Sequence, residues 1–286
     1  MRFGLQYSLR ASISDVVFKE VYIMQSFEYK ENYSTEDLVN IVAMLRAEDG
    51  CPWDKVQTHE TIRNNFIEEV YEVCDAIDKK DKAALCEELG DVLLQVVFHT
   101  QMEQEKGGFD LNDVADGICK KLILRHPHIF ADVEADTEEK VLDNWDKIKM
   151  EEKGQQSYTD TLKSVPAAFP ALMRAAKVQK RAGKANFDWD NVYDPLLKIG
   201  EELAELEESI EDGCACHIAE ELGDLLFAVV NVSRFVKVDA EQALQSATDK
   251  FVKRFEKVEN VCRERGIDMK SSTLEELDAI WDKIKH

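Results

Sequence analysis

The segment that decides the fold is EELGDVLL (residues 87–94), which recurs as EELGDLLF (residues 220–227). Around each copy, apolar residues follow the i, i+3/i+4, i+7 spacing of a single helix face. The apolar positions are Leu85, Leu89, Val92, Leu93, Val96 and Val97 in the first copy and Ile218, Leu222, Leu225, Leu226, Val229 and Val230 in the second. The segment therefore predicts one amphipathic helix that is present twice.

Other segments repeat in the same order along the chain. GCPWD (50–54) is echoed by NFDWD (186–190), and EEVYEV (68–73) is echoed by EELAEL (201–206). Two further pairs complete the repeat: Lys121/Arg125 with Lys250/Arg254, and Trp145/Lys149 with Trp281/Lys285. Conserved order with small changes in offset indicates one domain present twice, with insertions in the loops.

The repeat predicts a first domain over residues 34–150 and a second over 166–286. Residues 151–165 are polar and read as a linker, and residues 1–33 form an N-terminal extension with no readable role. Only 12 Gly and 5 Pro occur, and proline is absent after Pro195. We therefore expect an all-α protein in which each domain is a helical bundle.

The overall charge limits the range of partners. Against 58 Asp+Glu there are only 36 Lys+Arg, so the formal net charge is -22. A chain this acidic is repelled by nucleic acid polymers and anionic membranes, although a metal ion or a local basic cluster allows it to bind a small anion. No apolar run reaches the length of a membrane span, and the N-terminus lacks a signal-peptide core, so we expect a cytoplasmic protein.

Seven cysteines are scattered along the chain, an odd number. Cys214-Ala-Cys216 has no second pair near it in the sequence, which argues against a zinc ribbon. The interpretation that fits these observations is free thiols in a reducing cytoplasm.

Four acids recur at the same spacing of 3, 16 and 3 residues in each domain. They are Glu69, Glu72, Glu88 and Asp91 in the first domain and Glu202, Glu205, Glu221 and Asp224 in the second. Residues at i and i+3 share a helix face, so each pair projects its carboxylates in one direction. The gap of 16 residues holds a turn near 79–81 or 211–213, and the resulting hairpin sets the two pairs opposite each other.

Exposed acids on an acidic surface are the structural alternative for any single pair. Here, however, the acids interleave with the apolar face, and partly buried carboxylates resist joint ionisation. Hard divalent cations such as Mg²⁺ or Mn²⁺ relieve that repulsion. The sequence contains no Glu-x-x-His, which argues against a di-iron bundle. We therefore predict a magnesium site in the second domain and a second metal site in the first.

Basic and aromatic residues recur alongside the acids. Lys250 and Arg254 share a helix face at i, i+4, as do Trp281 and Lys285. The structural alternative is a solvated face with a core tryptophan. Because both pairs recur in the first domain, we favour a site for a nucleoside polyphosphate, which needs cations for the phosphates and a ring for the base.

The motifs together resemble the MazG nucleoside triphosphate pyrophosphohydrolases, in their two-domain bacterial form, over about residues 36–286. The matching segments are residues 50–55, 68–77, 88–98, 125–130 and 221–227. The resemblance implies a tandem repeat of all-α NTP pyrophosphatase domains that typically forms a homodimer. It also implies Mg²⁺-dependent hydrolysis of NTPs or dNTPs to the nucleoside monophosphate and pyrophosphate.

The resemblance assigns roles to individual residues of the second domain, which is the main catalytic one in the family. The metal ligands fall on Glu202, Glu205, Glu221 and Asp224, and the nucleotide contacts fall on Lys198, Lys250, Arg254 and Trp281, with Lys285 a weaker candidate. Lys198 precedes Glu202 by one helical turn, where the first domain has Asn65. His217 stands where relatives can carry Lys, which leaves its phosphate contact open.

The expected reaction is attack of a metal-activated water on the α-phosphorus, with pyrophosphate leaving toward the metal, Lys250 and Arg254. Glu201 or one of the four acids would accept the proton of that water. Two alternatives stay open: a narrower pyrophosphatase for dUTP, dCTP-like or phosphoribosyl-nucleotide substrates, and a non-catalytic nucleotide-binding regulatory or helical interaction protein. The second alternative applies most to the first domain, which lacks a cation at Asn65.

Overall fold

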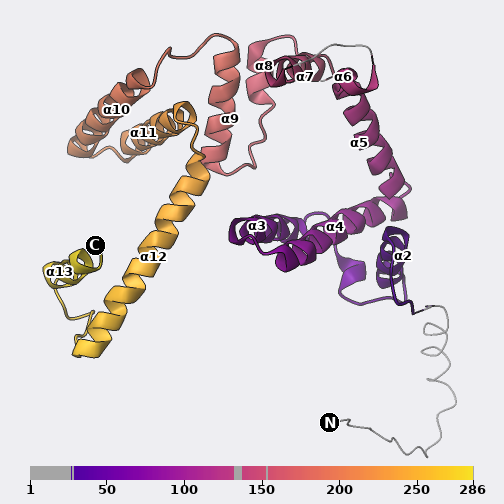
Figure 1. The fold of residues 1–286 in the computed structure, drawn as a ribbon, viewed down its shortest axis with the longest axis horizontal. Helices are drawn as coiled ribbons and strands as arrows, with labels where there is room; N and C mark the ends of the chain where they lie inside the picture. The colour runs from indigo at the N-terminus through magenta and orange to yellow at the C-terminus, as the bar shows by residue number, and fades with distance from the viewer. Residues whose placement is uncertain (1–26, 28, 132–136, 153, 286) are drawn as a thin grey trace, which may run out of the picture. The chain divides into compact units, whose positions relative to one another are not determined.

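The computed structural model describes residues 27, 29–131, 137–152 and 154–285, and its secondary structure is helical without a strand in these ranges (Figure 1). The all-α prediction is confirmed. Contacts divide the chain into two compact units, residues 1–134 and 135–286. The predicted extension, residues 1–33, lies mostly outside the described residues.

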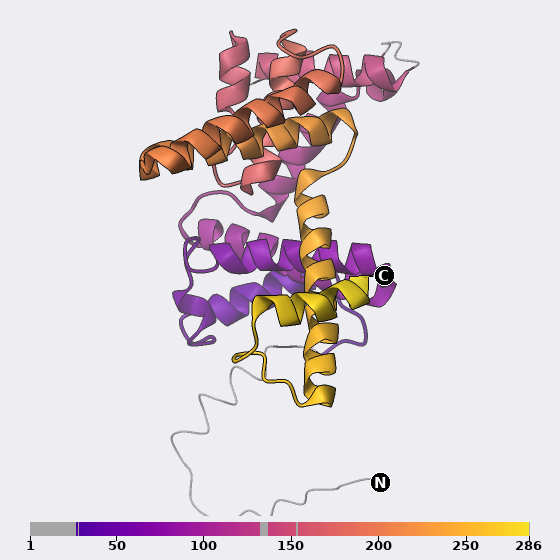
Figure 2. The same ribbon diagram turned by 90° about the vertical axis from the view of Figure 1, so that its left-hand side faces the viewer.

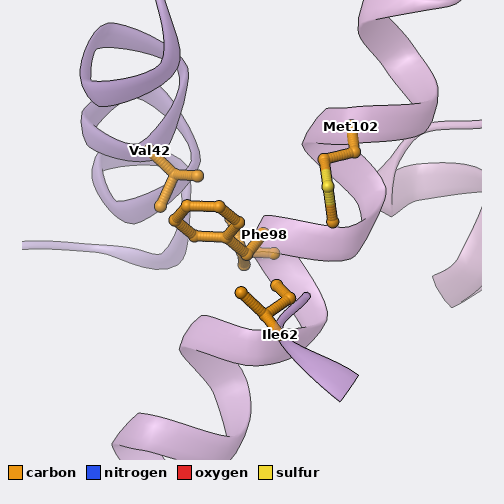
Figure 3. Close-up of a cluster of buried hydrophobic side chains, with 5 residues drawn as sticks. Val42, Ile62, Phe98 and Met102 are labelled. Atoms are coloured by element: carbon orange, nitrogen blue, oxygen red, sulfur yellow. The ribbon is translucent and has the colours of Figure 1, made fainter. Parts of the chain in front are cut away.

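The first unit is organised around its longest helix. Its elements are α2 (Thr35–Arg46), the 3₁₀ helix η1 (Asp54–Val56), α3 (Arg63–Lys79), α4 (Lys82–Glu105), α5 (Leu111–Arg125) and α6 (Pro127–Phe130). Helix α4 packs along α3, and α2 and α5 contact it as well. Where α4 contacts α2, the two helices share a small core, and α4 supplies most of its residues. The core consists of Val42, Ile62, Val97, Phe98 and Met102 (Figure 3).

The second unit repeats this hairpin with additional helices. Its elements are α7 (Glu138–Glu152), α8 (Tyr158–Lys163), α9 (Ala171–Lys184), α10 (Tyr193–Asp212), α11 (Ala215–Phe235), α12 (Ala240–Arg265) and α13 (Leu274–Lys285). Helices α10 and α11 lie side by side, α9 contacts α11, and α12 pairs with α13 (Figures 1 and 2). Helix α7 falls in this unit, and α8 lies within the segment 151–165.

Each long hairpin closes through a turn of two residues, located where the sequence predicts it. Helix α10 ends at Gly213, whose φ of 71° is left-handed, and Cys214 is the N-cap of α11. In the first unit Lys80 takes the left-handed conformation with φ 57°, and Asp81 caps α4 by accepting hydrogen bonds from the backbone N–H groups of Ala83 and Ala84. Such tight turns force the two helices to run antiparallel and adjacent.

The repeated NFDWD segment ties the start of the second hairpin to its end. Asp188 accepts two hydrogen bonds from Arg234 of α11, at 2.7 and 2.5 Å. The guanidinium holds the pKa of Asp188 below its usual value. A bidentate pair of this kind adds geometric specificity. It anchors the loop before α10 to the last turn of α11, so the repeat motif has a structural role.

A chain of titratable side chains joins the loop before α3 to α4. Nδ1 of His59 lies 2.7 Å from Nδ1 of His99, and Nε2 of His59 lies 2.6 Å from a carboxylate oxygen of Glu103. The two imidazole rings are stacked, and Lys106 pairs with Glu103 at 3.0 Å. Burial, followed by the charge of His59, lowers the pKa of His99 below 6.5.

We expect the first unit to lose stability on mild acidification. Because the folded state lowers the pKa of His99, its neutral form is favoured in the fold, and the stabilisation is complete above pH 6.5. It is lost as pH falls through the folded pKa, since the unfolded chain then binds more protons. The check is hydrogen exchange of α4 at about pH 7.5 and about pH 5.5, corrected for intrinsic exchange. The variant His99→Gln should reduce the difference; an unchanged difference contradicts the assignment.

Candidate metal centre and nucleotide site

The second hairpin brings three of the four predicted acids together. Carboxylate oxygens of Glu202 and Glu205 on α10 and of Glu221 on α11 all lie within 4.8 Å of one another. Glu202 is buried, with 6% of its surface exposed, Glu221 is half-buried and Glu205 is exposed. Asp224 is exposed and is not part of this group, which we call the second acid trio.

A lysine of α10 compensates the buried carboxylate of the second acid trio. Nζ of Lys198 lies 2.7 Å from Glu202 and 3.3 Å from Glu201. The hydrogen bond to Glu202 holds the pKa of Lys198 well above its usual range. Desolvation and then the charge of Glu202 raise the pKa of Glu205. Lys198 lowers the pKa of Glu205 but does not outweigh desolvation and the charge of Glu202.

The first hairpin repeats this arrangement. Carboxylate oxygens of Glu69, Glu72 and Glu88 also lie within 4.8 Å of one another, and we call these residues the first acid trio. Desolvation and then the charge of Asp91 raise the pKa of Glu69, and desolvation and then the charge of Glu72 raise that of Glu88. Asp91 is half-buried, in contrast to Asp224. Asn65 supplies no cation where the second hairpin has Lys198.

Each trio has the donor set of a hard divalent cation. Carboxylate oxygens are the ligands that Mg²⁺ and Mn²⁺ take in proteins, and oxygens this close can converge on one ion. Desolvation first, and the charges of neighbouring carboxylates second, raise the pKa values of Glu69, Glu88 and Glu205, so part of each shift is repulsion between the acids. A dication would remove this repulsion, so the residues present fit such an ion.

The predicted phosphate contacts Lys250 and Arg254 lie on another helix, α12. Lys250 and Arg254 line a shallow cavity along one face of α12, together with Ser246, Asp249, Lys253 and Lys257. Among the described residues, no ion pair joins Lys250 or Arg254 to the acid trio. The cavity gives α12 four clustered cations, which suits a chain of phosphates. Lys253 and Lys257 share this face through helical spacing, and the sequence analysis did not identify them as phosphate-binding candidates.

Trp281 packs within the helix pair α12–α13. It is half-buried against the core formed by Val258, Cys262 and Ile280, and the centre of its ring lies 5.2 Å from the centre of the Phe251 ring. Part of the ring therefore packs in a core, which was the alternative to a base-stacking role for this tryptophan. Its contact with a base stays a prediction. The side chain of Lys285 lies outside the described residues.

The remaining predicted residues, Glu201 and His217, are exposed. Glu201 faces Lys198, as described above. His217 lies at the start of α11, where its imidazole meets the thiols of Cys214 and Cys216. All seven cysteines are free, in agreement with the sequence analysis.

Comparison with known proteins bears on these two hairpins. A family model for the MazG nucleotide pyrophosphohydrolase domain matches residues 57–130 and 195–259. The nucleoside triphosphate pyrophosphohydrolase of Escherichia coli K12 is 44% identical over 251 residues, which cover 87% of this chain and 95% of that protein. The chain belongs to the MazG family. The resemblance inferred from the sequence motifs is confirmed.

Another MazG relative gives the same picture. The protein of Thermotoga maritima named nucleoside triphosphate pyrophosphohydrolase/pyrophosphatase MazG is 43% identical over 250 residues, covering 87% of this chain and 95% of that protein. The two MazG matches contain both acid trios, and the second also contains Lys198, Lys250 and Arg254, whereas Trp281 lies beyond it. A doubled MazG match confirms the tandem repeat of helical domains. No helix in the described ranges is long and apolar enough to cross a membrane.

Proposed function

We propose that the chain hydrolyses nucleoside triphosphates and their deoxy forms to the monophosphate and pyrophosphate, using Mg²⁺ or Mn²⁺ held by the second hairpin. The convergence of Glu202, Glu205 and Glu221 beside Lys198 carries this proposal. Asp224 is the fourth ligand that the repeat spacing suggests. A bound dication would neutralise phosphate charge and make a coordinated water more acidic.

The side chains around the trio have distinct tasks in this proposal. Lys198 sits close enough to Glu202 to meet a phosphate oxygen that approaches the same carboxylates. Glu201, exposed and 3.3 Å from Lys198, is the candidate for accepting the proton of the attacking water. Lys250 and Arg254 would bind the pyrophosphate as its charge develops, and Trp281 or its neighbour Phe251 would contact the base.

Product analysis tests the reaction class. We expect ³¹P NMR of the purified chain with Mg²⁺ and a mixed pool of NTPs and dNTPs to show pyrophosphate and nucleoside monophosphates. Release of inorganic phosphate with nucleoside diphosphate would contradict attack at the α-phosphorus. Turnover confined to dUTP or dCTP would identify the narrower pyrophosphatase.

The first hairpin supports a different role. Its acid trio is complete, but Asn65 replaces the lysine that pairs with the second trio. An amide supplies no charge for a phosphate oxygen, so we propose that the first domain binds metal and nucleotide but turns over slowly. This is the part of the chain to which a regulatory nucleotide-binding function applies.

We also propose that the protein is a cytoplasmic homodimer. The hairpin α10–α11 exposes Leu203 and Ile210 on one helix and Leu222, Leu226 and Val229 on the other, each set at helical spacing. Their exposed fractions lie between 44% and 57%, which leaves an apolar surface on both helices without a partner. Surfaces of this kind mark protein interfaces. A reducing compartment suits the seven free thiols.

Charge on this surface should dissociate the dimer. We expect Leu226→Glu to shift sedimentation velocity from dimer to monomer, because a carboxylate would be buried without a partner. The matched control, Lys270→Glu in the exposed loop before α13, adds acidic charge elsewhere and should leave the dimer intact. A wild-type chain that sediments as a monomer would contradict the proposal.

A further inference from the structure

The turn between α10 and α11 gathers three metal-binding side chains of a softer kind. Cys214 is the N-cap of α11, and Cys216 and His217 belong to its first turn. One donor atom from each of the three lies within 4.8 Å of the others, and the two sulfur atoms are 2.7 Å apart. We call these residues the Cys-His turn.

The donors of the Cys-His turn select a different ion from those of the acid trios. Thiolate sulfur and imidazole nitrogen are ligands of Zn²⁺ and similar ions, whereas Mg²⁺ takes oxygen. Three protein ligands leave one position of a tetrahedral ion for water. Cys216 and His217 are exposed and Cys214 is half-buried, so an ion can reach the donors from solvent.

The start of a helix favours the anionic form of the sulfur atoms. Backbone N–H groups and the positive end of the helix dipole stabilise a thiolate there. Cys214 is the N-cap of α11 and Cys216 lies in its first turn, so both sulfur atoms lie at this helix start.

This combination of donors is specific to the second hairpin. The equivalent turn of the first hairpin, Lys80-Asp81-Lys82, contains no sulfur. Apart from Cys214 and Cys216, no other cysteine belongs to a group of three donors in the described residues. The site therefore does not follow from the repeat that generates the acid trios.

We propose that Cys214, Cys216 and His217 form a site for Zn²⁺ or a chemically similar ion, separate from the acid trio. His217 precedes Glu221 by one helical turn, so a metal at the Cys-His turn would fix the helix start that leads to the trio. The site is independent of the proposed reaction, and its occupancy is measured without turnover.

Cobalt(II) absorption tests this site on the full-length chain. Under a metal-free phosphine reductant, Co²⁺ should give a near-ultraviolet band from thiolate-to-metal charge transfer. The intensity of this band should correspond to one site per chain, whatever Co²⁺ the acid trios also bind, because carboxylate ligands do not produce it. Excess Mg²⁺ should leave the band unchanged, and Zn²⁺ should abolish it by displacing Co²⁺. Zinc should compete at least about tenfold more strongly than Co²⁺, in keeping with its preference for sulfur.

Variants assign the band to its ligands. Cys216→Ser and His217→Ala should each weaken Co²⁺ affinity at least about tenfold, because each removes one donor. Cys216→Ser should also lower the intensity of the saturated band, since one thiolate remains, and the double variant Cys214→Ser/Cys216→Ser should abolish the band. The matched control is Cys119→Ser, an exposed thiol on α5 outside any group of donors, which should behave as the wild type. Absence of the band in the wild type, or its survival in Cys214→Ser/Cys216→Ser, overturns the proposal. Circular dichroism of each variant establishes that helix content is retained.

Discussion

Glu221→Gln will lower the turnover of NTPs with Mg²⁺ at least about 100-fold and abolish metal binding by the second hairpin. Glu221 is the only member of the second acid trio that comes from α11. An amide at this position removes one negative charge and offers a weaker donor to a hard cation. Steady-state kinetics and calorimetric titration with Mg²⁺ or Mn²⁺ measure the two effects.

Two matched variants make this result interpretable. Glu220→Gln changes an exposed neighbour in the same turn of α11 and should leave turnover intact. Glu88→Gln makes the equivalent change in the first acid trio and should lower the number of metals bound while most turnover remains. Full turnover in Glu221→Gln refutes the assignment of the catalytic site, and equal losses in Glu88→Gln and Glu221→Gln refute the division of labour between the hairpins.

Lys198→Asn will separate metal binding from catalysis. The ammonium of Lys198 occupies the carboxylate of Glu202 at 2.7 Å, so a cation that enters the trio must compete with it. In the absence of nucleotide, removing this charge should tighten Mg²⁺ binding roughly fivefold, because the ammonium no longer repels the incoming cation. The same change should lower kcat/KM for NTPs at least about 100-fold, since no cation remains to meet the phosphate.

The two halves of the chain supply the controls for this experiment. Lys198→Arg keeps the charge and should retain more turnover than Lys198→Asn. The reciprocal change, Asn65→Lys, introduces the cation into the first hairpin and should raise turnover in a Glu221→Gln background. Weaker Mg²⁺ binding in Lys198→Asn would show that the lysine supports the metal rather than competing with it.

The features of the site that could be predicted from the sequence are those that lie within a single helical hairpin. The 3-16-3 spacing of acids and the two-residue turn are properties of a single hairpin, so the convergence of Glu202, Glu205 and Glu221 follows from helix geometry. Asp224 marks the limit of predicting a carboxylate cluster from helical spacing. It lies at i+3 from Glu221 but is not among the carboxylates that lie within 4.8 Å of one another, because residues on one helix face need not converge on one point.

Contacts between distant segments could not be predicted in this way. The pairs Asp188–Arg234 and His59–His99 join residues 46 and 40 positions apart, and their register depends on how separate helices pack. The packing of Trp281 against Phe251 and the α12–α13 core also joins separate segments, so it could not be predicted from the sequence, and the contact of its ring with a base stays a prediction. The position of Lys250 and Arg254 relative to the acids has the same non-local origin.

The turn at Gly213 has a consequence for how the two copies have diverged. Because each hairpin is closed by its own pair of residues, a change of sequence in one copy leaves the geometry of the other untouched. One copy could therefore exchange Lys for Asn, and the other could acquire two thiols at its tip, without a compensating change elsewhere. Duplication of a self-contained hairpin thus allows one copy to change its sequence while the other keeps the original geometry.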